Sequence, residues 1–275
     1  MTSVHEGSVP SIVPGEGQRI LDLSRPMVLG MPQSPNHPEF RLSMPRRHGD
    51  NVRDDGGSAA NDLLVSGTHV GTHIDALGHV SHCGALHGGV DAAEAQVGGR
   101  LATHGVEEIP PIITRGILLD VPAVRGVESL DGGDEITPGD LDAALELAGV
   151  TPEPGDALLV RSGWGRNWDD RDAYVGRTSG VPGVGEAGAR WCASHRPVAV
   201  GADTIAFECL KPGAGHALLP AHRVLLVEEG IYIIETMALD ELADLGARVF
   251  TLVVAPLHLV GATGSPVRPL AVVDR

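Results

Sequence analysis

The sequence predicts an α/β fold, because short apolar runs that suit buried strands alternate with longer segments that suit helices. Hydrophobic residues make up 42% of the 275-residue chain, which is enough for a sizeable core in one domain. No internal repeat interrupts this alternation. Residues 1–19 are rich in Gly, Pro and Ser and lack periodicity. We therefore expect a flexible N-terminal arm over 1–19 and a single domain over 20–275.

The clearest helix begins after Thr137. Thr137 is a good N-cap, Pro138 fits the first turn, Asp140 suits the positive end of the helix dipole, and Gly149 ends the helix. Residues 44–60 are polar and predict a loop. The other expected elements are strands over 116–121, 157–161, 198–202, 231–235 and 249–254, and helices over 186–194 and 220–227.

Four residues that can bind a metal lie within eleven positions: His69, His73, Asp75 and His79. Imidazole binds Zn, Mn, Fe or Ni, and a carboxylate can bridge two ions. A helix is disfavoured here, because Gly71 is a poor helix former and three intervening residues are β-branched. A strand end and a glycine turn would instead fold His69, His73 and Asp75 around one point. The alternative is a surface loop that is rich in histidine by chance.

The motif His69-x3-His73-x-Asp75-x3-His79 resembles the signature of the cyclase family, which contains bacterial kynurenine formamidase, isatin hydrolase and other metal-dependent hydrolases. The resemblance extends over the chain from Leu21 onward. It implies a mixed barrel-like β-sheet flanked by helices, in a swivelling β/β/α architecture, and a homo-oligomer. The other segments that resemble the family are Asp22-Leu-Ser24, Gly30-Met-Pro32, Val200-Gly-Ala-Asp203-Thr204 and Gly261 to Pro269.

The same resemblance implies a second half of the metal site. His216 and Glu228 have the twelve-residue spacing of a histidine and a glutamate that complete this site in formamidase-like members. The family carboxylate usually precedes a Gly-Ile pair, which points instead to Glu229. We expect His79, His216 and Glu228 to be further metal ligands. We also expect proton transfer to involve His79, His216 and one of Glu228 or Glu229. His222 is interpreted as a packing residue or a partner of a ligand.

Glu235 is interpreted as structural. Four residues are candidates for substrate contact. His37 matches a family loop near the substrate, and Phe40 follows it in the same proline-rich segment. Trp164 and Trp168 would supply an aromatic wall, although packing in the core explains them equally well.

Composition excludes several kinds of partner. A net charge of −16 and only 3% aromatic residues argue against nucleic acid. No apolar run is long enough to span a bilayer, and the first residues lack the features of a signal peptide. We expect a cytoplasmic protein whose three widely spaced cysteines are reduced.

These observations predict an enzyme that uses one or two divalent ions, Zn or Mn, to activate water. Its substrate would be a small molecule with an amide, lactam or lactone bond that may be aryl-linked. A metal-dependent cyclase or dehydratase of a polyketide-type pathway is the alternative enzyme, and a metal-binding protein that sequesters a ligand is the non-enzyme alternative. No Gly-x-Ser-x-Gly elbow is present, which disfavours a serine hydrolase.

The segment 31–60 predicts assembly. Its four prolines suit an extended arm, and its apolar side chains need a surface to cover them. We expect this arm to close the pocket in part, in a homo-oligomer that is a dimer or a tetramer.

Overall fold

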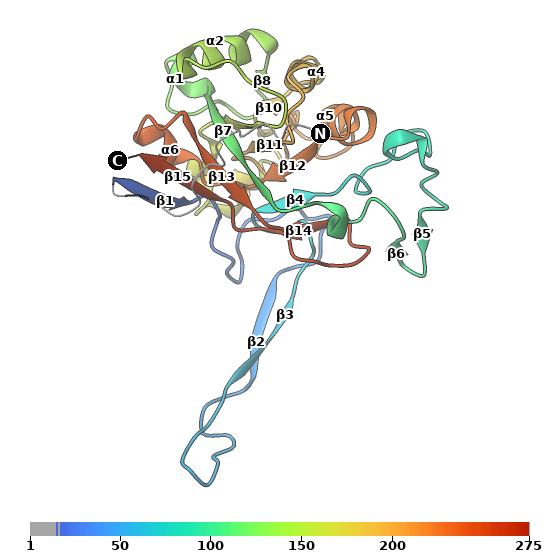
Figure 1. Cartoon of the computed structure of the whole chain (residues 1–275), viewed down its shortest axis with the longest axis vertical. Coiled ribbons are helices and arrows are strands. Elements are labelled where there is room, and N and C mark those ends of the chain that lie inside the picture. The colour runs from blue at the N-terminus through green and yellow to red at the C-terminus, as the bar shows by residue number, and fades with distance from the viewer. Residues whose placement is uncertain (1–14, 16, 275) are drawn as a thin grey trace, which may run out of the picture.

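The computed structural model describes residue 15 and residues 17–274, and a curled nine-stranded mixed sheet forms its centre (Figure 1). The strand order is β1-β15-β13-β7-β9-β11-β12-β4-β14. The four strands from β7 to β12 in this order are parallel, and the outer pairs are antiparallel. The predicted mixed sheet with flanking helices is therefore confirmed. Most of the predicted arm over 1–19 lies outside the described residues, and its last two residues belong to β1.

The strands of the large sheet are β1 (Gln18–Asp22), β4 (His73–Asp75), β7 (Ile112–Asp120), β9 (Ala157–Arg161), β11 (Ala199–Ala202), β12 (Tyr232–Glu235), β13 (Val249–Val254), β14 (Gly264–Pro266) and β15 (Leu270–Asp274). Three small pairs are β2 (Arg41–Arg46) with β3 (Asn61–Val65), β5 (Gln96–Val97) with β6 (Arg100–Leu101), and β8 (Glu135–Ile136) with β10 (Gly183–Val184). The helices are α1 (Val121–Arg125), α2 (Pro138–Ala148), α3 (Arg171–Val175), α4 (Glu186–Ser194), α5 (Pro220–His222) and α6 (Asp240–Asp244).

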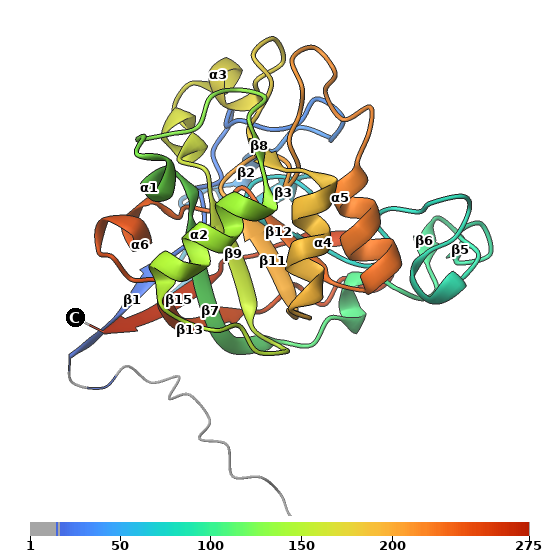
Figure 2. The same ribbon diagram turned by 90° about the horizontal axis from the view of Figure 1, so that it is seen from above.

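Helices α2, α4 and α5 lie side by side over one face of the parallel strands (Figure 2). Alternation along β9 explains why both faces are apolar: Leu158 and Val160 pack under these helices, and Ala157 and Leu159 pack on the opposite side. Each buried leucine contributes about 1.5–3 kcal/mol relative to an exposed one. The sheet is thus a rigid base for the loops at its edges.

The predicted helix over 220–227 differs from the structure. α5 contains a single turn and continues as a π-helical segment, Arg223–Glu229, which ends at Gly230 with φ of +69°. The wider π-helical turn changes which side chains of this segment face the core. None of the helices among the described residues is long and apolar enough to cross a membrane.

The polar loop predicted over 44–60 is partly replaced by β-structure. Strands β2 and β3 form a long hairpin that projects away from the sheet (Figure 1). Nearly all of its strand residues are exposed, including Leu42, Met44, Leu63 and Leu64. Residues 44–60 show no regular alternation of apolar and polar residues, because neither face of this hairpin is buried against the domain.

Candidate metal centre

The metal-binding motif turns sharply at Gly71 and then enters the sheet as β4. Gly71 has φ of +70°, a conformation that glycine adopts without strain. Its carbonyl oxygen lies 2.8 Å from Nδ1 of His73, which fixes the imidazole ring and turns Nε2 toward the site. The motif therefore combines a glycine turn with the end of a strand, the two features that the sequence predicts here.

Pairing of β4 with β12 brings a distant carboxylate to the motif. In this antiparallel register His73 is the partner of Glu235, and Asp75 is the partner of Ile233. Nε2 of His73 lies 3.3 Å from Oε2 of Glu235 as a result. The sheet register thus places Glu235, which was interpreted as structural, at the site.

Asp75 is the common member of two groups of potential ligands. Atoms of His69, His73 and Asp75 lie within 4.8 Å of one another, and atoms of Asp75, His79 and His222 satisfy the same limit. Nδ1 of His69 lies 2.7 Å from Oδ1 of Asp75. The structure therefore brings together all four residues of the first motif and adds His222.

One oxygen of the buried Asp75 carboxylate lacks a hydrogen-bond donor among the described residues. Asp75 is fully buried, and its Oδ2 accepts no hydrogen bond within the described part of the chain. Such an atom normally costs free energy unless it is paired with a donor or a cation. Imidazole and carboxylate ligands around this oxygen fit a divalent ion.

Glu208 orients His222, which comes from α5. Glu208 is buried, contacts Nδ1 of His222 and accepts a hydrogen bond of 3.2 Å from its backbone N–H. This contact leaves Nε2 of His222 directed at Oδ2 of Asp75, 3.5 Å away, and at Oε1 of Glu235, 3.2 Å away. A carboxylate behind a histidine in this way is typical of metal-binding histidines.

The charges of the cluster favour a cation. Burial opposes ionisation of Glu235, yet hydrogen bonds from His222 and His73 hold its pKa at about 2. Despite its burial, the carboxylates around His222 raise the pKa of this imidazole well above its usual value. The cluster therefore gathers buried negative charge, which a divalent ion bound among these side chains would balance.

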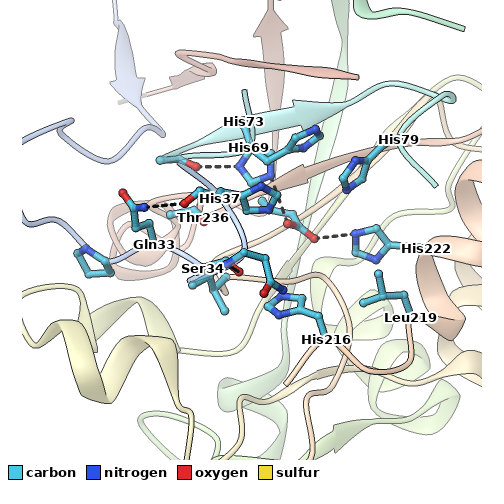
Figure 3. A pocket seen from close by; sticks show the side chains of 15 residues that line it. Gln33, Ser34, His37, His69, His73, His79, His216, Leu219, His222 and Thr236 are labelled. Atoms are coloured by element: carbon cyan, nitrogen blue, oxygen red, sulfur yellow. Dashed lines mark hydrogen bonds and ion pairs between the residues drawn. The ribbon is translucent and has the colours of Figure 1, made fainter. Parts of the chain in front are cut away.

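The cluster lines one wall of a cavity of about 210 Å³ (Figure 3). His37 lies in this cavity with its ring stacked on His69 at a centroid distance of 5.4 Å, and burial lowers its pKa to about 4. Gln33 fixes the loop that carries His37, because its side chain bonds the carbonyl of His37 and the N–H of Phe40. His216, which was expected as a ligand, lines the same cavity from a separate loop but belongs to neither group of potential ligands among the described residues.

Glu228 and Glu229 do not reach this cluster. The carboxylate of Glu228 pairs with Arg190 at 2.9 Å and with Arg223 at 3.1 Å, and both glutamates are exposed. The π-helical segment carries both residues to the outside of the domain. The expectation of Glu228 or Glu229 at the cluster is therefore wrong, and the glutamate that lies beside His73 and His222 is Glu235.

Three side chains predicted to contact the substrate do not line this cavity: Phe40, Trp164 and Trp168. Phe40 packs with Met31 and Val70, and Trp164 donates a hydrogen bond to the carbonyl of Tyr174 in a separate apolar cluster. Trp168 stacks edge-on against Tyr174 at 5.1 Å. The two tryptophans therefore pack in this apolar cluster and do not line the cavity.

Sequence reasoning missed Glu235 and Glu208 as neighbours of the site. Neither belongs to a histidine-rich motif, and each meets its histidine through a pairing distant in sequence. His222 carried a weak signal in the sequence, since it precedes an apolar segment that suits a helix. A buried glutamate at the end of a predicted central strand was the one available indication for Glu235.

The chain is similar in sequence to one protein family and to several of its relatives. Residues 21–209 match a family model described as "Putative cyclase". The isatin hydrolase of Roseibium aggregatum is 26% identical over 86% of this chain and 85% of its own length. Cyclase-like protein 3 of Oryza sativa is 27% identical over 78% of this chain, and the match spans 66% of that protein.

Solved structures share the fold. A structure described as a novel cyclase superposes with a TM-score of 0.83 at 30% identity, covering 94% of this chain and 89% of that one. Isatin hydrolase A from Ralstonia solanacearum gives a TM-score of 0.73 at 22% identity, covering 94% and 93%. The latter similarity bears on the fold alone.

Proposed function

Because the chain belongs to the cyclase family, we propose that it is a metal-dependent hydrolase that opens a small amide, lactam or lactone. The observation that carries the proposal is the buried carboxylate of Asp75, which belongs to both groups of potential ligands beside the cavity and whose Oδ2 accepts no hydrogen bond among the described residues. The isatin hydrolase of Roseibium aggregatum, a relative at 26% identity, supports the same class of reaction. A cavity of about 210 Å³ suits a small substrate.

The residues that would hold the metal are His69, His73 and Asp75 for one ion, and Asp75, His79 and His222 for a second. Glu235 lies close enough to His73 and His222 to join either group. Zn or Mn suits this set of nitrogen and oxygen ligands. When bound, such an ion lowers the pKa of water toward neutrality and polarises the carbonyl of the substrate.

His216 is the residue that we assign to proton transfer. It lines the cavity from its own loop and belongs to neither group of ligands. Burial lowers its pKa, so the imidazole is neutral at pH 7 and can exchange a proton with the leaving group. Gln33 and His37 close the opposite side and would orient the substrate.

The test is hydrolysis of three compound classes, namely aryl formamides, isatin-like lactams and dienelactones, by protein loaded with Zn or Mn. We expect turnover of at least one class, and loss of turnover after dialysis against a chelator, with recovery when metal is returned. A protein that binds metal fully but opens none of them would contradict the hydrolase proposal. Ring closure or dehydration of a polyketide-type substrate would then be the reaction to assay.

We also propose that the protein is a homo-oligomer, a dimer or a tetramer. The β2–β3 hairpin exposes Leu42, Met44, Leu63 and Leu64 at 48–58% of their surface. An isolated two-stranded hairpin is marginally stable in water, so contact with a second copy of the chain would stabilise it. The loop beside β2 carries His37 and Phe40, which links this contact to the cavity.

A further inference from the structure

A second cavity adjoins the metal cavity and differs from it in charge. It has a volume of about 380 Å³ and lies between the segment after α3 and the loop that carries His216. The two cavities share Asn36 and His216, which therefore form the wall between them. A molecule longer than the metal cavity would extend past these two side chains into the second cavity.

The second cavity is basic in a strongly acidic protein. Its lining includes Arg177 and Lys211 and no Asp or Glu among the described residues. Lys211 is the only lysine of a chain with 36 acidic residues and a net charge of −16. Two cations on one cavity wall are unexpected for such a composition, and they favour a negatively charged ligand.

Arg177 is the more available of the two cations. Lys211 donates a hydrogen bond of 3.0 Å to the carbonyl of Gly133 and lies 3.7 Å from Glu135. Arg177 is exposed and also borders a shallow acidic depression that includes Asp170 and Asp172, yet it forms no ion pair within the described part of the chain. A guanidinium with free donors suits a carboxylate, which it can bind through two parallel hydrogen bonds.

The backbone fixes this cation relative to the site. Arg177 follows Gly176, which ends α3 with φ of +61°, and its carbonyl accepts a hydrogen bond of 3.2 Å from the N–H of Gly213. Gly213 begins the loop that places His216 at the metal cavity. One backbone hydrogen bond therefore links the segment of Arg177 to the loop that carries His216.

We propose that the second cavity binds an anionic tail of the substrate, with Arg177 as the residue that selects it. The substrate would thus carry its scissile amide, lactam or lactone at the metal end and a carboxylate at the other end. This inference rests on the proposed hydrolase function for the assignment of the reacting end.

The experiment compares two formanilides, one with a propanoate in the para position and one with a propanol in its place. Turnover and binding by calorimetry are measured on metal-loaded wild type, Arg177→Gln and Arg171→Gln. Arg171 is a matched control, because it is an exposed arginine of the neighbouring α3 that does not line the second cavity. We expect wild type and Arg171→Gln to bind the anion about fivefold more tightly than the alcohol, and Arg177→Gln to bind both equally.

The outcomes separate the two proposals. Equal binding of both compounds by wild type, no binding of either, or the same preference in Arg177→Gln and wild type would overturn the anionic subsite. A preference in binding that Arg177→Gln removes, without turnover of either compound, would support the subsite and contradict hydrolysis of aryl formamides. Turnover of both compounds without preference would support the hydrolase and overturn the subsite.

Discussion

The carboxylate of Glu235 contacts two histidines of the site at once, through Oε2 to His73 and Oε1 to His222. It is 5% exposed and belongs to a central strand. Glu228, in contrast, pairs with two surface arginines. Mutation of Glu235 therefore tests the site, and the same mutation of Glu228 is its control.

We expect Glu235→Gln to lower metal affinity by at least about tenfold, since it removes a negative charge beside the proposed ligands His73 and His222. Glu228→Gln should retain the metal content of wild type. Metal analysis of the two variants, purified identically, measures the difference. Equal metal loss in both, or in Glu228→Gln alone, would contradict the placement of Glu235.

Glu208 supports the site through His222 and does not line the cavity. Glu208→Gln should weaken metal affinity by about 10–100-fold, because a neutral amide replaces the charged acceptor that sets the tautomer of His222. The measurement is competition with a chromophoric chelator. Glu186→Gln, at a surface glutamate paired with Arg190 and Arg223, is the control. Unchanged affinity in Glu208→Gln would show that His222 needs no such support.

At the residue scale, the sequence predicted the part of the site that lies within one turn. His69, His73 and Asp75 meet because Gly71 turns the chain between them. Glu235 could not be found in this way, because its position depends on the register of β12 against β4. Register is set by packing of the whole sheet rather than by local spacing.

At the element scale, α2 shows what local signals can determine. Thr137 and Asp140 form the reciprocal hydrogen bonds of a capping box, and the helix ends before Gly149 as expected. The predicted bounds of β9, α4 and β13 also agree with the structure. The β2–β3 hairpin and the π-helical segment were not predicted, because their form depends on contacts that periodicity does not contain.

Asp140→Asn should lower the free energy of unfolding by about 1 kcal/mol at pH 7, through weaker capping and loss of the pair with Arg125. Urea unfolding measures this, with the exposed Glu146→Gln of the same helix as the control. Arg125 and the Thr137 bonds hold the pKa of Asp140 well below its usual range.

The difference between wild type and Asp140→Asn should therefore depend on pH. A carboxyl with a lowered pKa in the folded state stabilises the fold above its unfolded pKa of about 4. The difference should be full above about pH 5 and shrink progressively as the pH falls below about 4. A difference that grows in acid would contradict the pairing of Asp140 with Arg125.

At the scale of the whole molecule, the hairpin predicts an oligomer. Light scattering at micromolar concentration should give a mass of at least twice 28.6 kDa. Leu63→Asp with Leu64→Asp, on the exposed β3, should shift the mass toward the monomer without loss of secondary structure. The matched change Leu147→Asp, at an exposed leucine of α2, should leave the mass unchanged. A wild-type monomer would contradict the assembly proposal.

The central claim is that the buried histidines around Asp75 hold divalent metal, and metal content tests it most directly. Elemental analysis of wild type purified without added metal should find about one or two equivalents of Zn or Mn. His73→Ala, with an unchanged circular dichroism spectrum, should lose most of this metal, because it removes a ligand of the group that contains Asp75. Full metal occupancy in His73→Ala, or no metal bound by wild type after incubation with Zn or Mn, would contradict the account.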